Sequence, residues 1–259
     1  VITGASSGIG EAAARALSKT GAKLIITGRS DATRTVAAEI GADYYIVDFT
    51  NFGEVRKFAA TLLSNYPRID VLVNNVGGII NNRRITSNRM EQTLQVNHLS
   101  GFLLTNLLRE RLEASEGMVI NTSSMANRVG NIRFDDLQSE RNYDPMKAYG
   151  SAKLMNILHA MEITQRFKGV KAASFHPGVV RTGFAREGKG MLRWMYESIA
   201  GKLIMISPEE GADTLVWLIT NKEWKSGEYF YKRKPGIKNK QANFQLSAEL
   251  WEASVKLTE

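Results

Sequence analysis

Residues 1–10, Val-Ile-Thr-Gly-Ala-Ser-Ser-Gly-Ile-Gly, join the end of an apolar strand to a turn that contains Gly4, Gly8 and Gly10. The good helix formers from Glu11 onward predict that a helix begins directly after this turn. Because glycine has no Cβ, the backbone N–H groups of the turn and the positive helix N-terminus can approach a pyrophosphate. The stretch therefore predicts a dinucleotide-binding strand, turn and helix, with an ordinary strand-to-helix connection as the alternative.

The composition is that of a globular chain. With 259 residues, of which 43% are hydrophobic, the chain is long enough to bury a large core. It contains no cysteine, which excludes disulfides, thiolate catalysis and metal sites with cysteine ligands. No apolar run approaches the roughly 18 to 20 residues that span a bilayer. We expect a cytoplasmic protein by default, and we expect further residues upstream because Val1 already lies inside a strand.

The formal net charge of +8 suits an anionic partner such as a phosphorylated cofactor, a membrane surface or nucleic acid. The densest basic patch consists of Lys232, Arg233, Lys234, Lys238 and Lys240. No known nucleic-acid-binding motif accompanies this patch, so we expect a solvated surface and no nucleic-acid partner. Peripheral contact with a membrane is the less favoured alternative.

Strand and helix patterns alternate along the chain and predict its fold class. After the strand at Val1, further strands are predicted to begin at Lys23, Asp43, Ile69, Met118, Lys171 and Tyr229. Helices are predicted at about 31–40, where Gly41 can end the helix, at 87–113 and at 149–167. This order predicts one α/β domain over residues 1–259, a doubly wound parallel β-sheet with helices on both faces.

The ends of the second and third strands carry candidate contacts to an adenosine. Arg29 follows the second strand, where an arginine can pair with a 2′-phosphate and an acidic residue would bind a free 2′-hydroxyl. This favours NADP(H), although Asp31 lies close enough in sequence to leave NAD(H) as the alternative. Asp48 either accepts from an adenine amino group or caps the helix after Thr50.

Hydroxyl, amide and amino groups follow at positions suited to catalysis. Ser123 and Ser124 end the fifth strand, at the edge where open parallel sheets bind ligands. Asn97 interrupts an otherwise apolar helical face. Tyr149 and Lys153 are four residues apart, so they share one face of a helix. A nearby ammonium lowers the pKa of a phenol toward neutrality, which suits proton transfer, whereas a chance pairing along the helix is the alternative.

Over nearly its whole length the chain resembles the short-chain dehydrogenase/reductase family. Residues 3–10 match the family's glycine motif, and residues 74–77 match its Asn-Asn-Ala-Gly turn, with Val76 in place of alanine. The resemblance implies catalytic roles for Asn97, Ser124, Tyr149 and Lys153, with Ser124 preferred to Ser123 because the second serine of the family's pair usually has this role. It also implies cofactor contacts at Gly4, Ser6, Ser7, Gly8, Ile9, Gly10, Arg29, Asp48, Phe49, Asn75, Gly77, Tyr149, Lys153, Pro177, Gly178, Val180 and Thr182.

Three segments are similar to the retinol dehydrogenase-like branch of this family: an insert at 133–140, within the 24 residues between Ser124 and Tyr149, and the segments 226–230 and 248–254. This branch typically acts on apolar alcohols and aldehydes with NADP(H). We therefore expect an NADP(H)-dependent carbonyl reductase or alcohol dehydrogenase with a small-molecule substrate. A catalytically idle NADP(H)-binding regulator that senses redox state is the alternative. The resemblance also implies a homo-oligomer.

Residues 184–206 fit a substrate lid, because Gly188 and Gly190 can act as hinges for a stretch rich in Met and Trp. A permanently packed core helix and a membrane-surface helix are the alternatives. His98, His159 and His176 lack the spacing of metal ligands, and no G-x-S-x-G motif surrounds the serines. We therefore expect neither a metal site nor a serine hydrolase.

Overall fold

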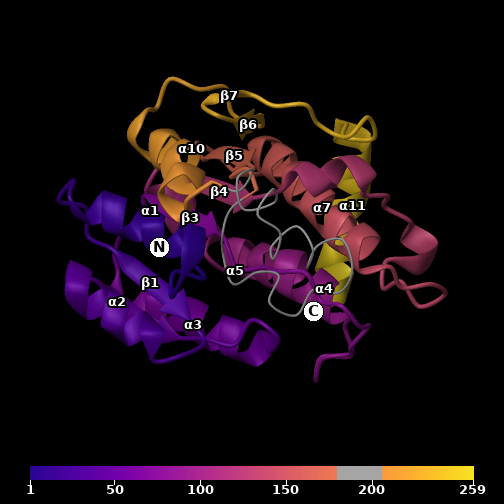
Figure 1. Ribbon diagram of the computed structural model, residues 1–259, viewed down its shortest axis with the longest axis horizontal. Helices are drawn as coiled ribbons and strands as arrows, with labels where there is room; N and C mark the ends of the chain where they lie inside the picture. The colour runs from indigo at the N-terminus through magenta and orange to yellow at the C-terminus, as the bar shows by residue number, and fades with distance from the viewer. Residues whose placement is uncertain (180–205) are drawn as a thin grey trace.

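A parallel β-sheet forms the centre of the computed structural model, which describes residues 1–179 and 206–259 (Figure 1). Strands β1 and β2 pair with each other, and β3, β4, β5 and β6 follow one another in parallel, with β7 antiparallel at the edge. The strands are β1 (Ile25–Gly28), β2 (Asp43–Ile46), β3 (Val71–Asn74), β4 (Met118–Thr122), β5 (Lys171–Phe175), β6 (Tyr229–Tyr231) and β7 (Lys234–Pro235).

Residues 1–3 join the two parts of the sheet. Ile2 forms parallel bridges to Ile26 of β1 and to Val73 of β3. The Thr3 amide donates to the Val73 carbonyl at 3.0 Å. The order across the sheet is therefore β2, β1, residues 1–3, β3, β4, β5, β6 and β7. The strands that follow residues 1–3 in the chain, β1 and β2, lie on one side of them, and β3 to β7 lie on the other side. The order of the strands thus reverses at residues 1–3, which opens a crevice at the carboxyl ends of the strands.

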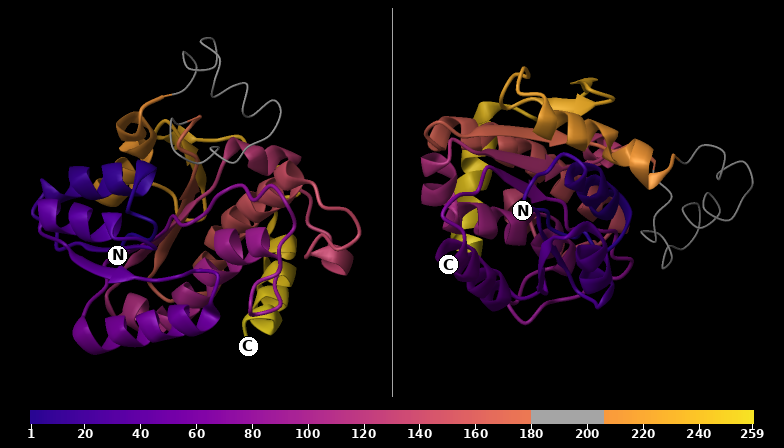
Figure 2. Two further views of the ribbon diagram at one scale, coloured as in Figure 1. Left: turned by 60° about the horizontal axis from the view of Figure 1, so that its bottom comes forward. Right: turned by 90° about the vertical axis from the view of Figure 1, so that its left-hand side faces the viewer.

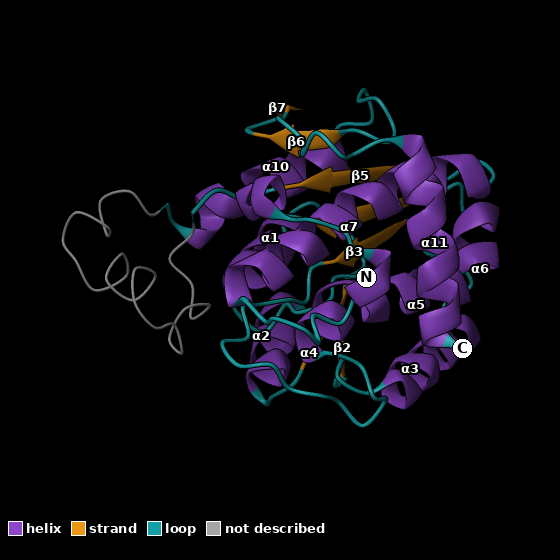
Figure 3. Cartoon of the chain, turned by 90° about the vertical axis from the view of Figure 1, so that its right-hand side faces the viewer, coloured by secondary structure: helices purple, strands orange, loops and turns teal. Residues whose placement is uncertain are grey.

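Helices cover both faces of the sheet, as the views in Figures 2 and 3 show. One apolar core lies under α1, α2 and α10, and a second lies under α3, α5, α6, α7 and α11. The helices are α1 (Gly8–Ser18), α2 (Ala32–Ile40), α3 (Phe52–Asn65), α4 (Gln92–Leu94), α5 (Ser100–Leu107), α6 (Arg109–Ala114), α7 (Pro145–Arg166), α10 (Pro208–Thr220) and α11 (Phe244–Thr258). The predicted doubly wound sheet with helices on both faces is confirmed.

Three helical segments of other types complete the described elements: a π-helical turn η1 (Gln95–Leu99) and two 3₁₀ helices, η2 (Met125–Val129) and η3 (Phe134–Asp136). The insert that the sequence indicated at 133–140 contains η3. Of the helices within 1–179 and 206–259, none has both the length and the apolarity to cross a membrane. The predicted lid at 184–206 lies outside the described residues except for Ile206.

The predicted helix at 87–113 begins later than its apolar pattern indicated. The Glu91 carboxylate accepts from the Thr93 and Leu94 amides at 2.7 and 2.8 Å, so the helix begins only at Gln92. It then passes through η1 before α5 and α6. Gly41, in contrast, ends α2 in the left-handed conformation with φ 66°, as the sequence predicted.

The helix that carries Tyr149 begins earlier than predicted, at Pro145. Asp144 caps it, since its carboxylate accepts from the Lys147 amide at 2.8 Å, and proline suits the first helical position. Tyr149 therefore lies in the second turn of α7, not at its start.

Two glycines bring η2 against α7. A Cβ on Gly150 of α7 would lie 2.6 Å from the Ala126 carbonyl oxygen, and a Cβ on Gly130 would collide with the Gly150 carbonyl. The two backbones are thus in direct contact, which places the residues after Ser124 beside the first turns of α7.

We expect Gly150→Ala to lower the free energy of unfolding by about 1 to 3 kcal/mol, because the added methyl group forces the backbones apart. This loss outweighs the roughly 1 kcal/mol by which alanine favours a helix over glycine. Gly53→Ala is the control, since Gly53 is exposed in α3 and its Cβ would meet only the Asn51 side chain, at 3.1 Å. Urea denaturation measures both variants, and a Gly150→Ala protein as stable as wild type would contradict the close packing.

Candidate active site

A cleft of about 940 Å³ lies at the carboxyl ends of the strands. This volume is at the upper end of the range for small-molecule and cofactor sites. The cleft brings together predicted site residues from distant parts of the chain: Gly4, Ser6, Ser7, Gly8, Ile9, Arg29, Asn75, Gly77, Ser124, Tyr149, Lys153, Pro177 and Gly178. Gly10, Asp48, Phe49 and Asn97 do not line it, and Val180 and Thr182 lie outside the described residues.

The glycine turn forms one end of the cleft. Gly4 and Gly8 have φ values of 67° and 61°, which favour glycine. Gly10 lies behind the turn, where a Cβ would collide with the Gly4 carbonyl. Ser7 is the N-cap of α1, but its side chain makes no capping hydrogen bond. The first N–H groups of this 11-residue helix therefore remain available for an anion, as a pyrophosphate requires.

Arg29 lies at the edge of the cleft, just after β1, and is exposed. Within the described part of the chain it has no ion-pair partner. Asp31, the residue that left NAD(H) open, has a side chain that is 94% exposed and lies 4.0 Å from Arg34. The Arg29 guanidinium, unpaired among the described residues, is therefore the charged group of this loop that lines the cleft. A guanidinium suits a phosphate better than a ribose hydroxyl.

Asp48 and Phe49 lie beside the cleft. Asp48 does not cap α3: its carboxylate accepts from the Thr50 amide at 2.9 Å, and Asn51 is the cap. The Phe49 side chain is 2% exposed and belongs to the core, while its carbonyl accepts from the Ser100 hydroxyl at 2.7 Å. Their predicted contacts with the cofactor stay predictions.

Tyr149 and Lys153 form the floor of the cleft. Both are buried, and the Lys153 Nζ lies 5.4 Å from the centre of the Tyr149 ring. The Lys153 ammonium donates to the Thr122 carbonyl at 3.2 Å, its one hydrogen bond to the described residues. Two of its three N–H groups are therefore available to a ligand. Burial lowers the pKa of Lys153 to about 7, so a bound anion or hydroxyl acceptor would stabilise its charged form.

The two serines at the end of β4 differ in their surroundings. Ser123 is 1% exposed, and its hydroxyl donates to the Lys153 carbonyl at 2.7 Å. Ser124 is half-buried, and its hydroxyl oxygen accepts from the Ala126 amide at 3.2 Å. The Ser124 hydroxyl proton thus remains free to donate into the cleft, whereas that of Ser123 is used within the fold.

Asn97 lies beneath the cleft in η1 and is 4% exposed. Its side chain accepts from the Gly78 amide at 2.9 Å and donates to the Gly78 and Thr93 carbonyls at 3.0 and 2.9 Å. A Cβ on Gly77 would collide with the Asn97 amide and lie 2.9 Å from the Lys153 Nζ. Asn97 therefore fixes the turn at 77–78 over the floor of the cleft, and its role as an anchor for a relay water stays a prediction.

An apolar wall completes the cleft. Met125, Val129 and Met146 line it and are 51%, 58% and 38% exposed, and Ile79 joins them. The sequence did not indicate Ile79, Arg128 and Val129, which also line the cleft. In the sequence, these three residues are marked only by their closeness to Gly77 or Ser124. Arg128 and Val129 lie in η2, which has no regular apolar pattern that would reveal them.

The short chain dehydrogenase family matches residues 1–193 of the chain. A Streptomyces sp. (strain C5) protein, named as a daunorubicin C-13 ketoreductase (DnrU), is 42% identical over 265 residues, which cover 98% of this chain and 90% of that protein. Retinol dehydrogenase 12 of Mus musculus is 35% identical over 272 residues, which cover 99% of this chain and 85% of the relative.

The fold has a close counterpart among solved structures. A crystal structure of an uncharacterised protein from Mycobacterium paratuberculosis matches with a TM-score of 0.80 and 27% identity, over 99% of this chain and 91% of that chain. The chain therefore belongs to the short-chain dehydrogenase/reductase family, in its retinol dehydrogenase-like branch, whose members are oxidoreductases of alcohol and carbonyl groups.

Proposed function

We propose that the protein is an NADP(H)-dependent carbonyl reductase or alcohol dehydrogenase for small apolar substrates. One observation carries the proposal: Ser124, Tyr149 and Lys153 line the same cleft as Arg29 and the glycine turn. A proton donor, a buried cation and a cradle for phosphates thus share one space.

The residues present fit the cofactor. Residues 4–9 would hold the pyrophosphate, Arg29 the 2′-phosphate, and Lys153 the hydroxyls of the nicotinamide ribose. Asn75, Gly77, Pro177 and Gly178 would border the rest of the cofactor. The nicotinamide, when bound, supplies or accepts the hydride.

The protein's side chains bind the substrate oxygen and supply the proton that this oxygen receives. In the reductive direction, the Ser124 hydroxyl donates a hydrogen bond to the substrate carbonyl oxygen and so stabilises the charge that develops there. Tyr149 donates its proton to that oxygen. The Lys153 ammonium, 5.4 Å from the Tyr149 ring, stabilises the phenolate that remains. When substrate covers Met125, Val129 and Met146, the apolar wall would limit the access of water to this step.

Tyr149→Phe removes the proton donor and should lower kcat by about 100-fold or more, while the NADPH Kd stays within about threefold. NADPH oxidation with a panel of aldehydes and ketones measures the first quantity, and ligand fluorescence the second. Tyr231→Phe is the matched control, because Tyr231 stacks on His176 at 4.0 Å and does not line the cleft. Full activity in Tyr149→Phe would contradict the assignment, and a wild type that binds NADPH without turnover would favour a redox-sensing regulator.

Arg29→Ala should weaken NADPH binding by about tenfold or more and leave NADH binding nearly unchanged, because the lost contact is a charge-assisted one to the 2′-phosphate. Titration with each dinucleotide tests this. Arg34→Ala serves as the control, since Arg34 is an exposed arginine of α2 that does not line the cleft. Equal affinity of the wild type for NADPH and NADH would contradict the cofactor preference.

Along a series of straight-chain aldehydes, KM should fall by about fourfold for each added methylene until the cleft is full, since burying a methylene contributes about 0.8 kcal/mol. Val129→Thr, which keeps the shape of the side chain but adds a hydroxyl, should flatten this trend. Val255→Thr on α11, which does not line the cleft, should not. A preference for charged or phosphorylated carbonyl compounds would exclude the apolar substrate class.

A further inference from the structure

Asn156 lies one turn after Lys153 on α7 and is 4% exposed. Its side-chain amide donates two hydrogen bonds, to the Asn97 carbonyl and to the Thr122 carbonyl, each at 3.0 Å. The Thr122 carbonyl is also the acceptor of the Lys153 ammonium, at 3.2 Å. Asn156 and Lys153 therefore share one acceptor, and Asn156 joins η1 to the end of β4 beneath the catalytic floor.

The orientation of the Asn156 amide determines the tautomer of His98. Because both of its N–H groups face carbonyls, its oxygen faces the His98 Nδ1 at 3.3 Å. An amide oxygen can only accept, so His98 carries its proton on Nδ1. The His98 Nε2 then accepts from the Ser254 hydroxyl at 3.0 Å. Burial lowers the pKa of His98 to about 4, so the ring is neutral at physiological pH, as this arrangement requires.

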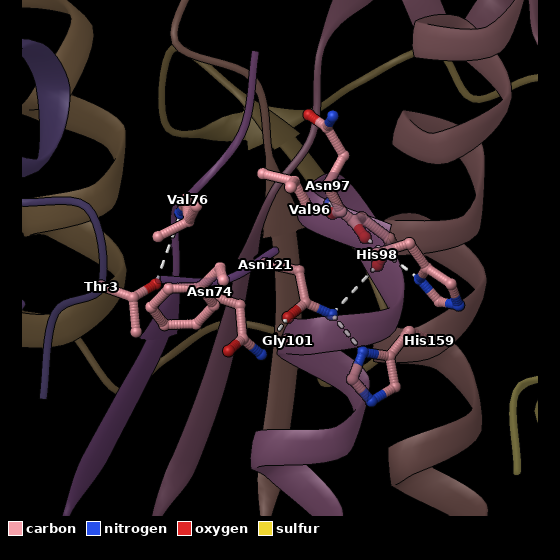
Figure 4. A pocket seen from close by; sticks show the side chains of 11 residues that line it. Thr3, Asn74, Val76, Val96, Asn97, His98, Gly101, Asn121 and His159 are labelled. Atoms are coloured by element: carbon pink, nitrogen blue, oxygen red, sulfur yellow. Dashed lines mark hydrogen bonds between the residues drawn. The ribbon is translucent and has the colours of Figure 1, made fainter. Parts of the chain in front are cut away.

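A small cavity lies beside this hydrogen-bond chain, and Asn97, His98 and Asn156 are among the residues that line it. Figure 4 shows His98 and Asn97 on one side of a small cavity, with Asn121 between Asn74 and His159. The cavity has a volume of about 10 Å³, room for one water at most. The Asn121 side-chain amide donates to the Asn156 backbone carbonyl at 3.1 Å and fixes the backbone of α7 at this position. Lys153, His98 and His159 are the titratable groups around Asn156, and burial lowers the pKa of each.

We propose that Asn156 is a positioning residue for Lys153. We also propose that a chain of hydrogen bonds from Ser254 through His98 to Asn156 links the C-terminal helix α11 to the active site. Without the Asn156 amide, the Asn97 and Thr122 carbonyls each lose a buried donor. The Thr122 carbonyl, no longer held by Asn156, can then shift, and the Lys153 ammonium that donates to it moves relative to the Tyr149 phenolate that it stabilises. The catalytic part of this inference rests on the proposed function; the hydrogen-bond chain itself does not.

The first test uses the protein without cofactor. The chain has three histidines, so ¹⁵N-edited NMR can assign the tautomer of each ring. We expect His98 to carry its proton on Nδ1 in the wild type, and we expect its ¹⁵N shifts to change in Asn156→Leu and in Ser254→Ala. A His98 proton on Nε2 would contradict the proposed chain of hydrogen bonds, whether or not the protein is active.

The second test is kinetic. Asn156→Leu, which keeps the volume but removes both donors, should lower kcat by about tenfold or more and raise the solvent deuterium isotope effect, because proton transfer becomes slower. The aldehyde KM should stay within threefold. Thr105→Val is the matched control: Thr105 is fully buried and its hydroxyl accepts from the Asn74 side chain at 2.9 Å, but it has no hydrogen bond to Asn156. It should lower the melting temperature without a change in the isotope effect.

Ser254→Ala keeps the proposal testable if Asn156→Leu does not fold. Removal of the Ser254 hydroxyl should lower kcat by less than Asn156→Leu does, and it should raise the solvent deuterium isotope effect as Asn156→Leu does. Unchanged kcat and isotope effect in the folded variants would overturn the positioning role. A wild type without NADPH-dependent turnover would instead overturn the proposed function, and the tautomer of His98 would then decide whether the chain exists.

Discussion

The hydrogen bonds that hold residues 1–3 between β1 and β3 are the constraint on which the site depends. The Thr3 hydroxyl donates to the Val73 carbonyl at 3.0 Å and accepts from the Asn75 amide at 2.9 Å. The Asn75 side chain in turn donates to the Thr3 carbonyl at 3.0 Å. These bonds join the glycine turn to the turn after β3, so the phosphate cradle is held against the turn that lies over the floor of the cleft.

A single helix, α7, carries the reacting groups. The four-residue spacing aligns Tyr149 with Lys153, and one further turn places Asn156 behind them. The contact between Gly150 and η2 determines how far Ser124 stands from this face. A buried lysine is costly in an apolar core, and its lowered pKa reports that cost. The fold tolerates it because Lys153 borders the open cleft on one side and donates to the Thr122 carbonyl on the other.

The polar residues beneath the cleft show how a mainly apolar core can contain a directional network. Asn74, Asn121 and Asn156 each use their amide N–H groups to join neighbouring elements, and His98 connects the last of them to α11. Buried polar groups of this kind stabilise a fold only when nearly all are paired. Within the described residues, the side-chain oxygen (Oδ1) of Asn74 and the His159 Nε2 are the members of this network without a partner, and the small cavity lies beside them.

The sequence by itself determined the features that depend on local and periodic patterns: the order of strands, the glycine turn before α1, the end of α2 at Gly41, and the shared helical face of Tyr149 and Lys153. It also placed Arg29 and Ser124 at strand ends, where the topology of a parallel sheet puts them on the cleft. Only the tertiary structure decided the difference between Ser123 and Ser124, the position of Asn97 beneath the turn at 77–78, and the chain through Asn156 and His98. These features rest on contacts between distant residues, 59 positions apart for Asn156 and Asn97 and 156 for His98 and Ser254. No periodicity in the sequence records such pairs, because they form only when separate elements pack against one another.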